Sequence, residues 1–89
     1  MTKAEYNDLY NQLIYGHDAD LSIEGNRFFV EWNDAGITVY RMHGDSGTVA
    51  AVLRGEDRAE IVKELFDYPF TEGKRLNHSY QDIIILDIE

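Results

Sequence analysis

The segment His43-Gly44-Asp45-Ser46-Gly47 holds the three residue types of a serine-protease triad within five positions. Its Gly-Asp-Ser-Gly stretch matches the surroundings of the nucleophile in chymotrypsin-like proteases. In such a triad the serine, histidine and aspartate converge from distant segments, opposite an oxyanion hole. Here they are sequence neighbours, and Asp, Ser and Gly are residues that tight turns prefer. The segment therefore predicts a turn and no catalytic residue.

Histidines and carboxylates could also form a metal site or an acid pair. His17 with Asp18 and Asp20 offers three ligands at the head of a strand, but strand alternation sends His17 to the opposite face. His43 and His78 are isolated, and there is no cysteine. A hydrolytic carboxylate pair needs a cleft that raises one pKa, and a phosphate loop needs glycines in a pattern absent here. We expect no enzyme activity, no cofactor and no metal; the alternative is a small enzyme or metal-dependent regulator that uses His17 or His43.

The clearest chemical feature is charge, because 17 Asp and Glu stand against 8 Lys and Arg in 89 residues, a net charge of −9. Such a chain repels nucleic acid and anionic membranes and is attracted to a basic surface. A row of carboxylates along a strand, about 6.8 Å apart at every second residue, approximates the charge spacing of a phosphate backbone. The predicted partner-binding acids are Asp18, Asp20, Glu24, Glu31, Asp34, Asp57, Glu60 and Glu64. The alternative is that these acids only keep the protein in solution.

Two aromatic residues, Phe29 and Tyr40, fall out of phase with the inward-facing residues of their strands. Aromatic side chains on a wet sheet face are typical of interface hot spots. Both are therefore predicted to bind a partner, unless the faces are reversed and a helix covers them.

Capping signals and hydrophobic periods predict the elements that position these residues. Thr2 and Glu5 form a capping box ahead of an apolar stripe that stops at Gly16. Period-two patterns then predict four strands joined by turns at Gly25-Asn26, Asp34–Gly36 and Gly44–Gly47. The strands are expected within residues 17–24, 28–33, 37–42 and 48–54.

A second helix is predicted from Asp57 to a point before Pro69, because the residue ahead of a proline is driven out of helical geometry. Leu76–Tyr80 is expected to form one helical turn, and Ile83–Ile88 a last strand. That strand is apolar on both faces, so we expect it inside the sheet or under a helix. The prediction is one α+β domain over residues 1–89: an antiparallel meander sheet of four to five strands with two helices on one face, in the order α-β-β-β-β-α-β.

The absence of cysteine fits a reducing compartment, and the apolar run Ile83–Leu86 is too short to span a bilayer. The first residues lack the apolar core of a signal peptide. We expect a cytoplasmic location.

The C-terminal third is similar to small uncharacterised bacterial and prophage proteins. The matching stretches are Glu60–Phe66, Tyr68-Pro69-Phe70, Gly73-Lys74 with Leu76, and Ile83–Ile88, and Gly25–Trp32 resembles their second strand. The resemblance carries no known activity or catalytic residue. It implies an origin in phage or mobile-element conflict.

These observations predict a non-enzymatic, acidic protein-binding module. Its partner would be a basic protein, such as a nuclease or another nucleic-acid-binding protein, inhibited by a mimic of nucleic-acid charge in the anti-CRISPR or anti-restriction manner. An immunity protein that neutralises a basic toxin is a further alternative. The alternative from another class is a self-associating structural module, in which the aromatics and Ile83–Leu86 form a homodimer. Reversing the charge of Asp18 and Asp20 is expected to slow association and to leave the fold intact.

Overall fold

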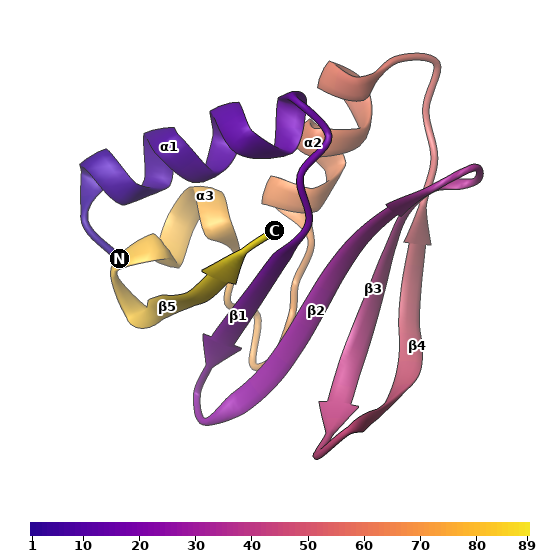
Figure 1. The fold of residues 1–89 in the computed structure, drawn as a ribbon. Helices are drawn as coiled ribbons and strands as arrows, with labels where there is room; N and C mark the ends of the chain where they lie inside the picture. The colour runs from indigo at the N-terminus through magenta and orange to yellow at the C-terminus, as the bar shows by residue number, and fades with distance from the viewer.

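A computed structural model describes all residues 1–89 as one five-stranded antiparallel sheet with its helices on one face (Figure 1). The elements are α1 (Lys3–Ile14), β1 (Ala19–Ile23), β2 (Asn26–Asn33), β3 (Gly36–His43), β4 (Ser46–Leu53), α2 (Arg58–Asp67), α3 (Leu76–Ser79), the 3₁₀ turn η1 (Tyr80–Asp82) and β5 (Ile83–Ile88). The strand order is β4-β3-β2-β1-β5. The α+β class and the meander are confirmed. The helical turn expected at Leu76–Tyr80 is present as α3, and counting it as a helix makes the order α-β-β-β-β-α-α-β.

Helix α1 begins and ends where its sequence signals predict. The Thr2 hydroxyl accepts a hydrogen bond from the Glu5 amide at 3.1 Å, and the Glu5 carboxylate accepts one from the Thr2 amide at 2.8 Å. These bonds satisfy free N–H groups of the first turn. Leu9 and Leu13 are buried against the sheet, and Gly16 adopts φ +99°, which favours glycine after a helix end.

The first hairpin turns one residue earlier than predicted. Ile23 pairs with Asn26, so the two turn residues are Glu24 (φ 53°) and Gly25 (φ 77°) rather than Gly25 and Asn26. Asn26 instead belongs to β2, where its Oδ1 accepts a hydrogen bond from Arg41 at 2.7 Å. Glutamate tolerates a left-handed φ poorly, but the hairpin register requires it here.

The core lies between the sheet and the helices. Its largest fully buried side chains come from every element except β4 and the 3₁₀ turn, and Phe28 at the centre packs edge-on against Phe70 with ring centroids 5.2 Å apart. They are Leu9, Leu13, Leu21, Ile23, Phe28, Val30, Ile37, Val39, Val62, Leu65, Leu76 and Ile83. Because all sit on the helix side of the sheet, the opposite side is left without a second layer. No helix has the length and apolar composition that crossing a membrane requires.

The expectation that the last strand lies inside the sheet is wrong, because β5 forms one edge. The alternative, that a helix covers the strand, holds for one face only, where Ile83 joins the core cluster. Ile83 is buried, but Ile84 and Leu86 are 59% and 51% exposed. The helices cover only one face, so the outward residues of this strand have nothing above them. An irregularity in the pairing with β1, between Asp20 and Leu21, lets Leu86 bulge from the ladder.

Candidate functional site

The uncovered side of the sheet, which we call the open face, presents one continuous row of side chains across all five strands. Cross-strand pairing places Val49, Tyr40, Phe29, Asp20 and Asp87 side by side, from β4 to β5. Directly opposed residues on neighbouring strands share a face and lie in contact range. The row is therefore apolar and aromatic toward the β4 edge and acidic toward the β5 edge.

The aromatic part of this row is the pair predicted from sequence. Phe29 on β2 and Tyr40 on β3 are partners in register, and their rings stack with centroids 6.5 Å apart and planes inclined by 30°. The Tyr40 hydroxyl donates to the Glu31 carboxylate at 3.5 Å. Both rings are partly exposed, and no helix covers them. The structure therefore brings Phe29, Tyr40 and Glu31 together on one solvent-facing surface.

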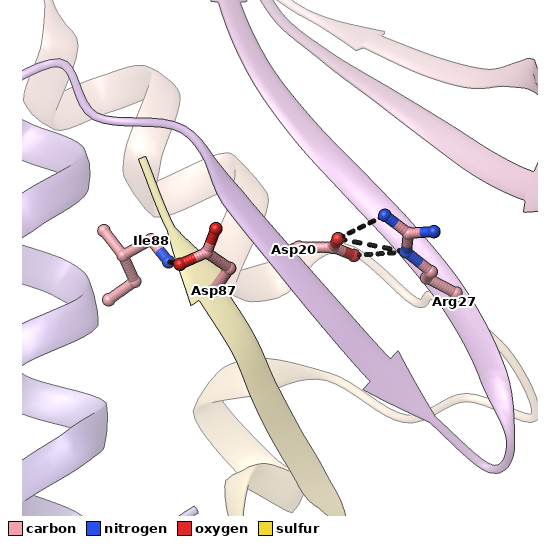
Figure 2. A network of polar contacts seen from close by, with 4 residues as sticks. All are labelled: Asp20, Arg27, Asp87 and Ile88. Atoms are coloured by element: carbon pink, nitrogen blue, oxygen red, sulfur yellow. Dashed lines mark hydrogen bonds and ion pairs between the residues drawn. The ribbon is translucent and has the colours of Figure 1, made fainter. Parts of the chain in front are cut away.

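The acidic part of the row is organised around an ion pair (Figure 2). Asp20 on β1 accepts hydrogen bonds from the Arg27 guanidinium on β2 at 2.9, 3.0 and 2.6 Å. These bonds, and then the negative charge of Asp20, raise the pKa of Arg27. Asp20 is only 9% exposed, so its charge mainly binds Arg27 and is little available to a partner. Asp87, on the other side of Asp20, has no cation within ion-pair distance.

Asp18, the predicted neighbour of Asp20, also has a structural role. Its Oδ1 accepts a hydrogen bond from the Trp32 backbone N–H at 2.9 Å, which ties the entry to β1 onto β2. Charge reversal at Asp18 and Asp20 therefore breaks contacts within the fold as well as changing charge. The expectation that such variants keep the fold intact does not agree with these contacts, so a test of the surface needs other positions.

The remaining predicted acids lie away from this row. Glu24 and Asp34 occupy hairpin turns, and Glu24 lies 3.8 Å from the Lys74 ammonium. Asp57 caps α2 by accepting a hydrogen bond from the Glu60 amide at 2.9 Å, and Glu60 and Glu64 are exposed on α2. Figure 1 shows α2 in the helix layer, so these three acids belong to a different layer from the open face. The predicted acidic residues thus divide between the open face, the entry to β1, the hairpin turns and α2.

The segment that resembles a protease motif forms the β3–β4 turn. The Ser46 hydroxyl donates to the His43 backbone carbonyl at 3.2 Å, and the His43 Nε2 lies 3.3 Å from the Thr48 hydroxyl. The imidazole is therefore not placed to accept the serine proton. No group of three or more His, Asp or Glu side chains in the chain is arranged to hold a metal ion.

Two surface cavities lie in or beside the helix layer. The larger, about 530 Å³, is a groove between α1 and α2 floored by Tyr6, Tyr10 and Phe66. Burial, and then the nearby Asp67, raises the pKa of Tyr6. The smaller, about 380 Å³, lies between the β2–β3 turn and the start of α2, beside Arg58. Arg58 is already engaged there, because it donates to the Ile14 carbonyl at 3.2 Å and lies over the Trp32 ring. Neither cavity gathers the acids of the open face.

Comparison with protein-family models, curated proteins and solved structures gave no match. The resemblance to prophage proteins therefore stays a prediction, and function must be argued from the surface itself.

Sequence patterns missed several residues of the open face. Val49 and Val52 on β4 are 60% and 42% exposed and belong to no sequence prediction, whereas Ile84 and Leu86 at the other edge lie in the Ile83–Leu86 stretch predicted for the homodimer alternative. The signal for β4 was present: a run of eight residues, Ser46–Leu53, without a charge in a chain of net charge −9. Arg27 was also missed, and its role follows only from the hairpin register.

Proposed function

We propose that this chain is a non-enzymatic protein-binding module, that it binds through the open face, and that its partner is a basic protein. The observation that carries the proposal is the cluster of Phe29, Tyr40 and Glu31, which combines two solvent-facing aromatics with a carboxylate that has no ion-pair partner. Aromatic anchors beside charge are typical of protein interfaces.

The charge of the whole molecule supports a basic partner. Ion pairs engage only Asp20, Glu24 and Asp82 among 17 acidic side chains. Arg27 is the basic side chain on the open face, and it is bound to Asp20. Glu31 and Asp87 lie on the same face and add negative charge that no ion pair neutralises. Such a surface attracts a cationic partner over a distance set by ionic strength and holds it by apolar contact.

A nuclease or another nucleic-acid-binding protein of the cytoplasm is the partner that fits this chemistry best. Its groove carries lysine and arginine side chains spaced to meet phosphates, and carboxylates can occupy the same places. Inhibition by such a mimic, as in anti-CRISPR or anti-restriction proteins, would be competitive with nucleic acid. Neutralisation of a basic toxin would use the same surface and the same electrostatics.

The test is a capture experiment with matched variants. The immobilised wild-type protein, the double variant Phe29→Thr/Tyr40→Thr, Glu31→Gln and the control Asp8→Asn are exposed to lysate and eluted with a salt gradient. Asp8 is an exposed acid on α1, in the opposite layer, so Asp8→Asn matches Glu31→Gln in charge. We expect a basic protein that salt releases, with reduced recovery on the two open-face variants only.

A second readout checks the mechanism. If the captured protein is a nuclease, the wild-type chain should inhibit DNA cleavage, and excess duplex DNA should displace the chain. Equal recovery on all four proteins, or recovery of acidic partners unaffected by salt, would contradict the proposal.

A further inference from the structure

The two edges of the sheet differ in how far they are protected against pairing with another strand. At β5 the backbone nitrogen of Met1 donates to the carbonyls of Tyr80 (2.9 Å) and Ile83, so the start of that edge is occupied. Asp87 lies within β5, and the strand bulges at Leu86. Charge, a bulge and a covered start are devices that keep edge strands from pairing.

Of these three features the β4 edge has only a bulge, at Ala50. Every other strand carries a charged residue, whereas Ser46–Leu53 carries none and contains no proline. None of its backbone groups takes part in a hydrogen bond outside the regular ladder. The strand is eight residues long, and Figure 1 shows it at the outer margin of the sheet with nothing beyond it. An uncharged edge of this length is a template for a further strand.

The one irregularity of β4 creates an apolar stripe along this edge. Val49 pairs with Tyr40 and Val52 pairs with Thr38, so the extra residue Ala50 puts two valines three positions apart on the same face. Regular alternation would send them to opposite faces. Val49 and Val52 are 60% and 42% exposed at the margin of the open face, with Tyr40 beside them.

We propose that the occupant of this edge is a second copy of the chain, which pairs β4 antiparallel with β4 about a two-fold axis. Two molecules of net charge −9 repel each other, and the repulsion is weakest where neither presents a charge. An antiparallel register with Ala50 opposite Ala51 of the second copy brings Val49 opposite Val52 of that copy, twice by symmetry. The product is a ten-stranded sheet whose outer edges are the two protected β5 strands, so assembly stops at the dimer.

The first experiment is sedimentation velocity on the wild-type protein from about 1 µM to about 1 mM, a range that covers dissociation constants of weak dimers. We expect the mass to rise with concentration toward that of a dimer. Val52→Lys should raise the dissociation constant at least about tenfold, since it places two ammonium groups at the new strand pair. Ile84→Lys on β5, at a residue of the other edge that is 59% exposed against 42% for Val52, should leave the dissociation constant unchanged. Circular dichroism checks that both variants fold.

The register is tested by disulfide capture, which the chain permits because it has no cysteine. A mixture of Val49→Cys and Val52→Cys proteins should form a cross-linked heterodimer under mild oxidation. Either variant alone should link far more slowly, because residues 49 and 49, or 52 and 52, lie outside disulfide distance in this register. If the Val49→Cys protein alone formed disulfide-linked dimers as fast as the mixture, the proposed register would be wrong.

A strict monomer at the highest concentration, or loss of the dimer in Ile84→Lys but not in Val52→Lys, would overturn the proposal. The result is independent of the basic partner, because it is obtained with the purified chain alone. The response to salt also distinguishes dimer formation from binding to a basic partner. Added salt screens like charges and should strengthen the dimer, whereas it should weaken binding to a basic protein.

Discussion

At the scale of single residues, the acidic side chains of this protein have two kinds of role. Asp18, Asp20 and Asp57 accept hydrogen bonds that stabilise the fold. Glu31 and Glu64 accept no hydrogen bond from a backbone N–H. Sequence composition cannot separate the two kinds, because an aspartate that caps a helix and one that faces a partner have the same letter. The contacts of each carboxylate decide which substitutions test function and which test stability.

Substitutions at Asp57 can separate the effect of its helix-capping hydrogen bond from the effect of its negative charge. Asp57→Ala should lower the free energy of unfolding by about 1 kcal/mol, because the Glu60 amide loses its acceptor. Asp57→Ser removes the same negative charge but keeps an acceptor, so most of the stability should remain. Urea denaturation of both variants measures the difference. Equal losses would mean that the charge at the start of α2, and not the cap, is what matters.

Tyr6 gives a pH dependence whose sign follows from its surroundings. Burial, and then the charge of Asp67, raises the pKa of Tyr6 above its ordinary value of 10.0. The folded state therefore holds this proton more tightly than the unfolded state. The resulting stability is complete below pH 10 and is lost as pH rises through the raised pKa. Tyr6→Phe removes the titrating group, so it should flatten the alkaline fall in melting temperature. An unchanged alkaline limb would show that another group controls it.

At the scale of elements, local signals predicted nearly every helix and strand, while register and edge position had to come from the fold. The capping box at Thr2 and Glu5 and the alternation in β2 and β3 each act within a few residues. The turn at Glu24-Gly25 was missed because a shift to Gly25-Asn26 would also place Leu21 and Ile23 opposite apolar residues of β2. Alternation alone cannot choose between the two registers.

The same limit explains what was missed at the candidate site. The placement of Phe29 and Tyr40 on the open face follows from alternation, but their stacking depends on the two-residue turn at Asp34-Ala35 that sets the β2–β3 register. The exposed state of Ile84 and Leu86 could not be predicted, because a strand apolar on both faces looks the same in a sheet centre and at an uncovered edge. That distinction depends on where the helices pack.

The two faces of β2, the core face with Phe28 and the open face with Phe29, should therefore contribute very differently to stability. Phe28→Ala should lower the free energy of unfolding by about 3–5 kcal/mol, because it empties the centre of the core. Phe29→Thr keeps a residue that favours strands and removes only a cross-strand contact, so its cost should stay below about 1 kcal/mol. Urea denaturation of the adjacent variants checks the contrast. A large loss for Phe29→Thr would indicate that the open face is structural rather than available for a partner.

At the scale of the whole molecule, excess negative charge opposes folding. The protein measures 32 × 30 × 23 Å, so at about 0.01 M salt, where the screening length is about 30 Å, almost every pair of its charges interacts. With 17 acids, 8 bases and only three ion pairs, most of these interactions are repulsive. Stability should therefore depend on salt with a positive sign, opposite to that of a fold held by ion pairs.

Raising sodium chloride from about 0.01 M to about 0.1 M shortens the screening length to about 10 Å and should raise the melting temperature. Glu64→Lys tests the cause, because Glu60 and Glu64 are like charges one turn apart on the exposed side of α2. The variant replaces that repulsion with an attraction between Glu60 and the introduced lysine one turn later, worth a few tenths of a kcal/mol at low salt. It should melt higher than wild type in dilute buffer, and the difference should shrink as salt is added. Calorimetry at both ionic strengths measures this; a melting temperature that falls with salt would show that attractive pairs, and not the net charge, dominate the electrostatics of the fold.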